Sequence, residues 1–259
     1  MPYANTDDGI RIYYEAEGHG PALVLVHGSG GNHAIWWQQV PYFAQRYLTI
    51  AVDLRGFGNS DNIPDGPDAR DFPRDLLAVL DEVKVQRAVL LGQSIGALAC
   101  LRLAVAHPER TAGVILAHSA GNLDDDELAR MTAADRAAAE KLTVLDRLMS
   151  KSFQSRSPEL TWLFQKIGTF NRAHQRSIRS LQEKGPKPEA VMRSKVPLAL
   201  LAGEKDAVIS IATLRKAQAL VPGATLLVAP DGPHSLYWEN PAIFNLLVEQ
   251  FLRGLDLAR

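Results

Sequence analysis

The chain is poor in cysteine and has almost no net charge. Cys100 is the only cysteine among 259 residues, so no disulfide can form within the chain and a zinc site built from several cysteines is excluded. The formal net charge is -1 and the sequence pI is about 6.7, which gives no general attraction to nucleic acid or to an anionic membrane. The composition therefore predicts neither of these partners and leaves a homo-oligomer open.

Long hydrophobic runs are also missing from the chain. None approaches the roughly 20 residues that a membrane span needs. The N-terminal stretch MPYANTDDGIRIYYE lacks both the basic start and the apolar core of a signal peptide. We therefore expect a soluble, cytoplasmic protein.

Short apolar runs alternate with helical patterns over most of the chain. Runs as short and as apolar as these are typical of strands that are covered on both faces. The predicted strands are 10–16, 22–26, 48–53, 88–92, 113–117, 197–202 and 224–229, and the predicted helices are 35–46, 71–83, 95–107, 212–220 and 241–254. The alternation predicts an α/β fold, with a mostly parallel, doubly wound sheet flanked by helices on both faces.

The alternation stops between residues 120 and 195, where no strand pattern appears. Much of this segment is rich in Ala, Leu, Glu, Asp and Arg, which favours helix. Gly185, Pro186 and Pro188 then break the helical pattern before the next strand. We predict that 120–195 is a helical lid inserted over the carboxyl edge of the sheet, and that 1–119 and 196–259 together form the core.

Positive charge is concentrated in the second part of this predicted lid. Residues 141–195 contain twelve Lys and Arg against four Asp and Glu. Such a run is usually the solvated face of a helix. The functional alternative is a lid that attracts anionic substrates, such as carboxylate-bearing ring-cleavage products.

Ser94 lies between Gly92 and Gly96 in the stretch VLLGQSIGALAC, in the pattern G-x-S-x-G. A buried strand leads into this stretch and an apolar helix leads out, which is the setting of a nucleophilic serine on a tight turn. Ser94 would lie at a helix N-terminus, where backbone N–H groups stabilise negative charge. The alternative is an ordinary serine that caps a helix.

A nucleophilic serine needs a base and an acid that orients the base. His234 lies in the turn-rich loop VAPDGPHSLYWENP after the last apolar strand, where catalytic groups collect in parallel sheets. His118 closes another strand and is the second choice. Asp206 follows a strand in ALLAGEKDAVIS and is the candidate acid, with a turn aspartate as the alternative. The order Ser, Asp, His, each on a loop after a strand, favours catalysis.

A glycine-rich loop, HGSGGN, follows the predicted strand at 22–26. Its glycines would let the backbone approach a substrate carbonyl, and the N–H groups of Ser29 and Ile95 could hold the oxyanion of acyl transfer. A phosphate-binding loop is the alternative, but HGSGGN matches neither a Walker motif nor a dinucleotide-binding G-x-G-x-x-G. The predicted site requires no metal and no organic cofactor.

Five segments, taken in order, resemble the α/β-hydrolase family in its single-domain, lidded form. HGSGG is similar to the oxyanion loop, DLRGFGNSD to the D-x-R-G-x-G-x-S turn, GQSIGA to the nucleophile elbow, GEKDAVI to the acid loop, and GPHSLYWENPAIFNLLVEQFL to the histidine loop and last helix. The resemblance covers most of the chain. It implies that Ser94 is the nucleophile, His234 the base and Asp206 the orienting acid.

The chain departs from the family pattern at two positions. Gln93 stands where the family often has histidine, and Ala97 stands where glycine is common. Both departures affect the expected shape of the pocket floor. Dehalogenases and epoxide hydrolases of the family carry aspartate at the elbow, so Ser94 argues against those activities.

The leading hypothesis is a serine hydrolase that cleaves a small carboxylic ester or lactone through an acyl-enzyme. One alternative is hydrolysis of a carbon–carbon bond in a diketone acid by the same three residues, which predicts an inward-facing Arg from the lid. Another is a ligand-sensing receptor with very slow turnover, and hydroxynitrile lyase chemistry is a further variant. The partner is then a small-molecule substrate, and the residues expected to line its pocket are Gly28, Gly30, Trp36, Gln93, Trp162 and Tyr237.

Overall fold

A computed structural model describes residues 2–257, so residues 1 and 258–259, at the two ends of the predicted core, lie outside it. Within the described residues, eight strands form one sheet in the order β1-β2-β4-β3-β5-β6-β7-β8. The strands are β1 (Tyr3–Asn5), β2 (Arg11–Glu17), β3 (Ala22–Val26), β4 (Leu48–Val52), β5 (Ala88–Gln93), β6 (Thr111–Ala117), β7 (Leu198–Gly203) and β8 (Thr225–Ala229).

The sheet is mostly parallel, as the sequence predicts. Strand β2 pairs antiparallel with both β1 and β4, whereas every other neighbouring pair is parallel. The seven predicted strands all form, with ends shifted by at most two residues. The short edge strand β1 was not predicted, because three residues are too few for a periodic pattern.

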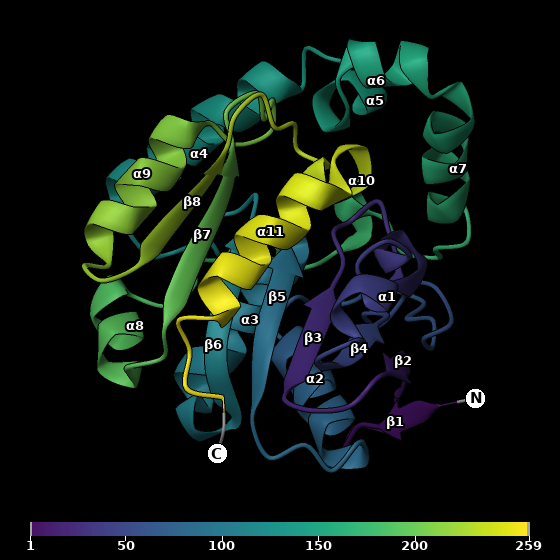
Figure 1. The fold of residues 1–259 in the computed structure, drawn as a ribbon, viewed down its shortest axis with the longest axis vertical. Coiled ribbons are helices and arrows are strands. Elements are labelled where there is room, and N and C mark those ends of the chain that lie inside the picture. The colour runs from purple at the N-terminus through teal and green to yellow at the C-terminus, as the bar shows by residue number, and fades with distance from the viewer. Residues whose placement is uncertain (1, 258–259) are drawn as a thin grey trace.

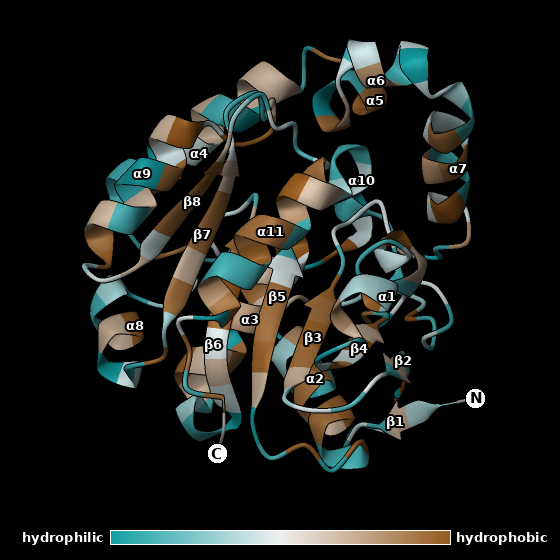
Figure 2. Ribbon diagram, viewed as in Figure 1, coloured by the Kyte–Doolittle hydropathy of each residue, from teal (hydrophilic) through white to brown (hydrophobic). Residues whose placement is uncertain are grey.

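Helices cover both faces of the sheet (Figure 1). On one face α2 (Phe72–Glu82), α3 (Ile95–Ala106), α8 (Pro188–Ser194) and α9 (Ile211–Leu220) contribute to one buried apolar cluster. On the other face α1 (Val40–Phe43) and α11 (Pro241–Leu252) contribute to a second cluster. Figure 2 shows the apolar strands β3 and β5 in the middle, between helices that also carry polar residues.

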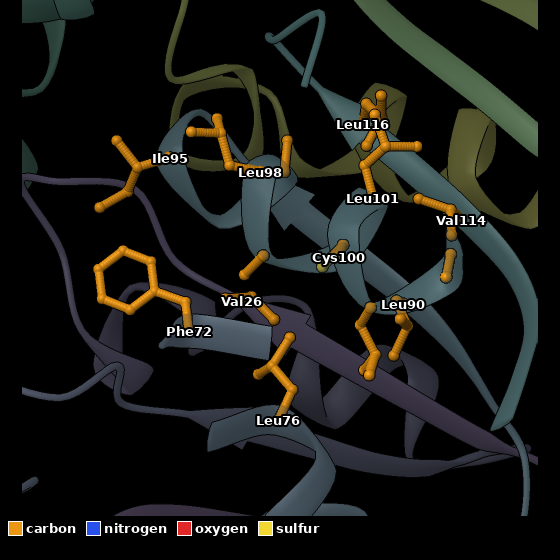
Figure 3. Close-up of a cluster of buried hydrophobic side chains, with 14 of the residues drawn as sticks. Val26, Phe72, Leu76, Leu90, Ile95, Leu98, Cys100, Leu101, Val114 and Leu116 are labelled. Atoms are coloured by element: carbon orange, nitrogen blue, oxygen red, sulfur yellow. The ribbon is translucent and has the colours of Figure 1, made fainter. Parts of the chain in front are cut away.

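Helix α3 runs through the first cluster and is apolar on nearly all sides, because it is enclosed between the sheet and other helices. In the cluster of Figure 3, Leu98, Cys100 and Leu101 of this helix lie with side chains of β5 and β6. Burial raises the pKa of the Cys100 thiol. Cys100 is therefore a core residue with an inert thiol.

The predicted helix at 35–46 differs from the structure. A short 3-10 helix, His33–Trp36, and the single turn of α1 stand in its place. Gln39, between them, donates its side-chain amide to the backbone oxygen of Tyr237 at 3.0 Å. Because this contact joins residues that are far apart in the sequence, the local pattern of apolar residues does not predict it.

Between β6 and β7 the chain forms α4 (Asp126–Ala139), α5 (Val144–Leu148), α6 (Lys151–Arg156), α7 (Pro158–Gly168), a 3-10 turn (Gln175–Ser177) and α8. Figure 1 shows α5, α6 and α7 beyond the carboxyl ends of the strands. Helix α8 lies elsewhere, packed against α3 with Val191 in the first apolar cluster. Pro188 begins this helix, where its missing N–H costs nothing, so it does not break a helix as its sequence context suggested.

Within residues 2–257, no helix is both long and apolar enough to cross a membrane.

Candidate functional site

Ser94 lies on a strained turn between β5 and α3. Its φ of 53° and ψ of -113° are values that residues other than glycine rarely adopt. A Cβ atom on Gly92 would lie 2.4 Å from the backbone of Gly96, and one on Gly96 would lie 2.5 Å from the backbone oxygen of Val26. The two glycines of G-x-S-x-G are therefore required by close packing around the turn.

Asp206, on the loop after β7, is hydrogen-bonded to His234, on the loop after β8. The Nδ1 atom of His234 lies 3.0 and 2.9 Å from the two carboxylate oxygens of Asp206. The backbone N–H groups of Val208 and Ile209 donate to Oδ1 of Asp206 at 2.7 and 3.1 Å. These contacts hold the carboxylate in place and orient the His234 ring.

A second histidine, His118, shares the same carboxylate. Its Nδ1 atom lies 2.9 Å from Oδ2 of Asp206. Burial acts to raise the pKa of Asp206, but attraction to His234 and the hydrogen bonds from both histidines outweigh it, and the pKa lies well below its usual range. Asp206 is therefore ionised at neutral pH.

Ser94, His118 and His234 line one cavity of about 690 Å³. Ser29 and Ile95 line it too. Within the described part of the chain, the backbone N–H groups of these two residues donate no hydrogen bond. Two free donors therefore lie on the wall that carries Ser94.

The loop after β3 is held in shape by His27. Its Nε2 accepts a hydrogen bond from the Leu54 N–H at 3.1 Å, so its proton is on Nδ1, which donates to the Gly28 oxygen at 2.8 Å. Burial lowers the pKa of His27, which keeps the ring neutral and able to accept. The histidine of the HG motif thus supports the loop that carries Ser29.

Four of the predicted pocket residues, Gly28, Gly30, Gln93 and Tyr237, line the cavity. A Cβ atom on Gly28 would lie 1.9 Å from Oε1 of Gln93, so a side chain at position 28 would displace the Gln93 amide. Gln93 also donates to the backbone oxygen of His234, at a long distance of 3.5 Å.

The two predicted tryptophans do not line the cavity. Trp36 is fully buried and packs against the rings of Tyr237 and Phe244. Trp162 is 59% exposed on α7, with Lys166 over its ring. The sequence places both near the site but does not show which way each side chain points; on α7 it is Phe164 that faces inward and lines the cavity.

Four cationic side chains reach the cavity wall from the segment between β6 and β7: Arg136, Arg147, Arg176 and Lys184. Arg136 donates to Gln182, and Lys184 pairs with Asp124 at 2.8 Å. Arg147 is different, because its Nε atom is sealed from solvent and has no hydrogen-bond partner among the described residues. The excess of Lys and Arg over 141–195 is the sequence signal for three of the four, since Arg136 lies before this range, and it does not single out Arg147.

Within residues 2–257, one group of three or more histidine, cysteine or acidic side chains has its possible metal-ligand atoms within 4.8 Å of one another, and it consists of His118, Asp206 and His234. In the structure the Nδ1 atoms of both histidines are used in hydrogen bonds to Asp206. These hydrogen bonds already pair the Asp206 carboxylate with both Nδ1 atoms, and we assign no ion to the group.

Comparison with known proteins supports the same interpretation of the fold. The sequence model of the alpha/beta hydrolase fold family matches residues 21–241. The chain belongs to this family. The family match and the relatives described next, which are an enol-lactonase, a lactone degrading enzyme and a hydrolase, identify this chain as an enzyme.

The chain is 28% identical to 3-oxoadipate enol-lactonase 2 of Acinetobacter baylyi, with 97% of this chain and 96% of that protein aligned. It is 38% identical to 2-hydroxymuconate semialdehyde hydrolase of a Pseudomonas species over 117 residues, which are 44% of this chain and 41% of that protein. Among solved structures, Est816, described as an N-acyl homoserine lactone degrading enzyme, is similar with a TM-score of 0.79 and 27% identity over 96% of this chain and 100% of that one.

Proposed function

We propose that this α/β-hydrolase cleaves a small carboxylic ester or lactone through a covalent acyl-enzyme on Ser94. The observation that carries the proposal is the Asp206–His234 pair, joined at 2.9 Å, on the same cavity as a serine held at φ 53°. A base oriented by a buried carboxylate and a serine on a strained turn are the two parts that nucleophilic catalysis requires.

The reaction then follows from these parts. His234 accepts the proton of the Ser94 hydroxyl as Oγ attacks the carbonyl carbon, and the carbonyl oxygen becomes an oxyanion. The N–H groups of Ser29 and Ile95 hold this oxyanion. His234 returns the proton to the leaving-group oxygen, and the ester bond breaks. A water molecule, deprotonated by His234, repeats the attack and releases the acid and free Ser94.

The chemistry of the cavity favours a substrate that carries a carboxylate. Arg147 lines the cavity, and its Nε atom makes no hydrogen bond within residues 2–257. Because Nε is itself sealed from solvent, a carboxylate would be bound through the terminal nitrogens of the guanidinium. Its helix, α5, is attached to the histidine loop, since the Ser235 N–H donates to the Leu148 oxygen at 3.0 Å. A carboxylate bound by Arg147 would place the other end of a small substrate toward His234 and Ser94.

We propose that helices α4 to α7, within the 120–195 segment, act as the lid of this site. Helix α8 belongs with the core layer, because it packs on α3. The core would then comprise residues up to 119 together with α8 and the chain from β7 onward.

Hydrolysis of a carbon–carbon bond is the second candidate. It is favoured by the same inward-facing Arg147 and by the partial likeness to 2-hydroxymuconate semialdehyde hydrolase. A diketone acid would place its carboxylate at Arg147 and present a ketone to Ser94. The ligand-sensing alternative differs from both in predicting very slow turnover.

The test is hydrolysis of p-nitrophenyl acetate and butyrate against pH by the wild type, Ser94→Ala and Ser119→Ala. Ser119 also lines the cavity and serves as the matched serine control. We expect turnover in the wild type and in Ser119→Ala, and at least a thousandfold loss in Ser94→Ala, the order seen when a nucleophile is removed. Full activity in Ser94→Ala overturns the proposal. Weak activity of all three on esters, with turnover of acidic diketones, selects carbon–carbon hydrolysis.

A further inference from the structure

His118 occupies a specific position beside the catalytic pair. It follows the last residue of β6 with a φ of 57°, and its N–H donates to the Leu201 oxygen at 2.8 Å. Its side chain and that of Asp206 are both fully buried. The rings of His118 and His234 meet at 65° with their centroids 5.6 Å apart. Both histidines contact Oδ2 of Asp206 at 2.9 Å.

The position of the proton on His118 follows from its partners. Burial lowers the pKa of His118, although Asp206 partly offsets this, so the ring is neutral at pH 7. An ionised carboxylate only accepts hydrogen bonds, so the single ring proton is on Nδ1 and points to Asp206. The Nε2 atom is sealed from solvent and has no hydrogen-bond partner in residues 2–257. His118 is therefore a fixed donor to Asp206 and is poorly placed to act as a base itself.

We infer that His118 is a positioning residue that competes with His234 for Asp206 and thereby limits how strongly this carboxylate stabilises the protonated form of His234. The inference rests on the proposed function, in which His234 is the base. A hydrogen-bond donor to a carboxylate stabilises its negative charge and thereby weakens the attraction between that carboxylate and a neighbouring cation. Removing the His118 donor is therefore expected to leave more of the Asp206 charge to His234, and the variants below test this.

Two titratable groups act on His118 in the structure. They are Asp206, from the loop after β7, and His234, from the loop after β8. The positive charges of His118 and His234 would oppose each other, so the buried group holds at most one added proton near neutral pH.

A matched pair of variants tests the inference. In His118→Asn the side-chain amide nitrogen takes the place of Nδ1, so a donor to Asp206 is kept, and asparagine tolerates a positive φ. His118→Leu has the same branching at Cγ but no donor. The measurement is the pH dependence of kcat/KM for p-nitrophenyl butyrate.

We expect the acid limb of the profile to move to higher pH by about half a unit to one unit in His118→Leu, and to stay near the wild-type position in His118→Asn. A general loss of stability would lower rates without moving the limb. The inference is overturned if the pH profiles of the two variants coincide, whatever the absolute rates of the variants.

A second measurement does not depend on activity. NMR titration of the His234 ring is carried out in the Ser94→Ala background, with and without His118→Leu. The same upward movement of the His234 midpoint supports the inference even if Ser94→Ala keeps full activity, in which case the proposed function alone fails. Unchanged midpoints overturn the inference while leaving the function intact.

If His118→Leu does not fold, the inference is tested by proton NMR of the histidine ring N–H groups in the wild type and in His118→Asn. Strongly hydrogen-bonded Nδ1–H protons resonate far downfield. His27 and His33 give such signals as well, because their Nδ1 atoms bond the Gly28 oxygen and the Asp53 carboxylate. Beyond these, we expect two signals assigned to His118 and His234 in the wild type, and the loss of the His118 signal in His118→Asn. A wild type without a His118 signal, or a spectrum that is unchanged in His118→Asn, overturns the inference.

Discussion

Asn32 and Asn171 join the loop after β3 to the end of α7. The Asn32 amide donates to Oδ1 of Asn171 at 3.2 Å, and the Asn171 amide donates to the Gly31 oxygen at 2.9 Å. The Gly58 N–H also donates to Oδ1 of Asn171, at 3.1 Å. One side chain from the segment between β6 and β7 thus supports the loop that carries Ser29.

Replacing Asn171 with alanine is expected to lower kcat for p-nitrophenyl butyrate by about tenfold, with a smaller change in KM. The reason is that a loosened loop weakens the hold of the Ser29 N–H on the oxyanion, which forms only in the transition state. Thr169→Ala is the control, because its hydroxyl bonds only to the nearby Lys166 oxygen. Equal kcat values for the two variants would contradict the assigned role of Asn171.

Gly92→Ala is expected to destabilise the protein strongly. The added methyl group would lie 2.4 Å from the backbone of Gly96, and backbone cannot move aside as a flexible side chain can. We expect a loss of about 2 kcal/mol or more in the free energy of unfolding, measured by urea denaturation.

The control for this prediction is Gly30→Ala. An added Cβ at Gly30 meets no atom within 4 Å, and Gly30 lines the cavity, so its stability is expected to stay near that of the wild type. A Gly92→Ala protein as stable as Gly30→Ala would show that the turn at Ser94 is not tightly packed.

Arg147→Gln is expected to impair acidic substrates selectively. Removing a charge-assisted hydrogen bond raises KM for a carboxylate-bearing ester by about tenfold or more, whereas a neutral ester of the same length is affected little. Lys184→Gln is the comparison, since Lys184 lines the same cavity but already pairs with Asp124 and Asp126. Equal effects of both variants on both esters would remove Arg147 from substrate recognition.

The lowered pKa values of His27 and His118 are expected to cost stability as the pH drops below about 6.5, the pKa of an ordinary histidine, whereas the raised pKa of His33 acts in the opposite direction. Burial lowers the pKa of His27 and of His118, so below about pH 6.5 the unfolded chain takes up protons that the native state refuses. Each group then lowers the free energy of unfolding by up to about 1.4 kcal/mol per pH unit, and stability returns as pH rises again.

Urea denaturation at pH 7.5 and pH 5.5 checks this prediction. His118→Asn removes one of the two groups, so its loss of stability between the two pH values is expected to be smaller than that of the wild type. An equal loss in both proteins would mean that His118 is protonated in the native state.

The strands were predictable because each central strand is a continuous apolar run. Four strands are buried along their whole length, and they consist almost entirely of apolar residues: β3, β5, β6 and β7. The order of Ser94, Asp206 and His234 along the chain was also predictable, since the first two follow such strands and His234 follows the mostly apolar edge strand β8.

Side-chain direction in the pocket was not predictable in the same way. Trp36 follows the glycine-rich loop, but its ring turns into the core against Phe244. Trp162 and Phe164 lie two residues apart on α7, so they point to different sides, and only Phe164 lines the cavity. The sharing of Asp206 by His118 depends on the pairing of β6 with β7, which no local pattern reveals.

Covalent labelling with a fluorophosphonate, followed by mass spectrometry of the intact chain and its peptides, tests the central claim most directly. The account predicts one adduct per chain, located on Ser94, absent in Ser94→Ala, retained in Ser119→Ala and formed much more slowly in His234→Ala. An adduct on another residue, or labelling of Ser94→Ala at the wild-type rate, would contradict Ser94 as the nucleophile.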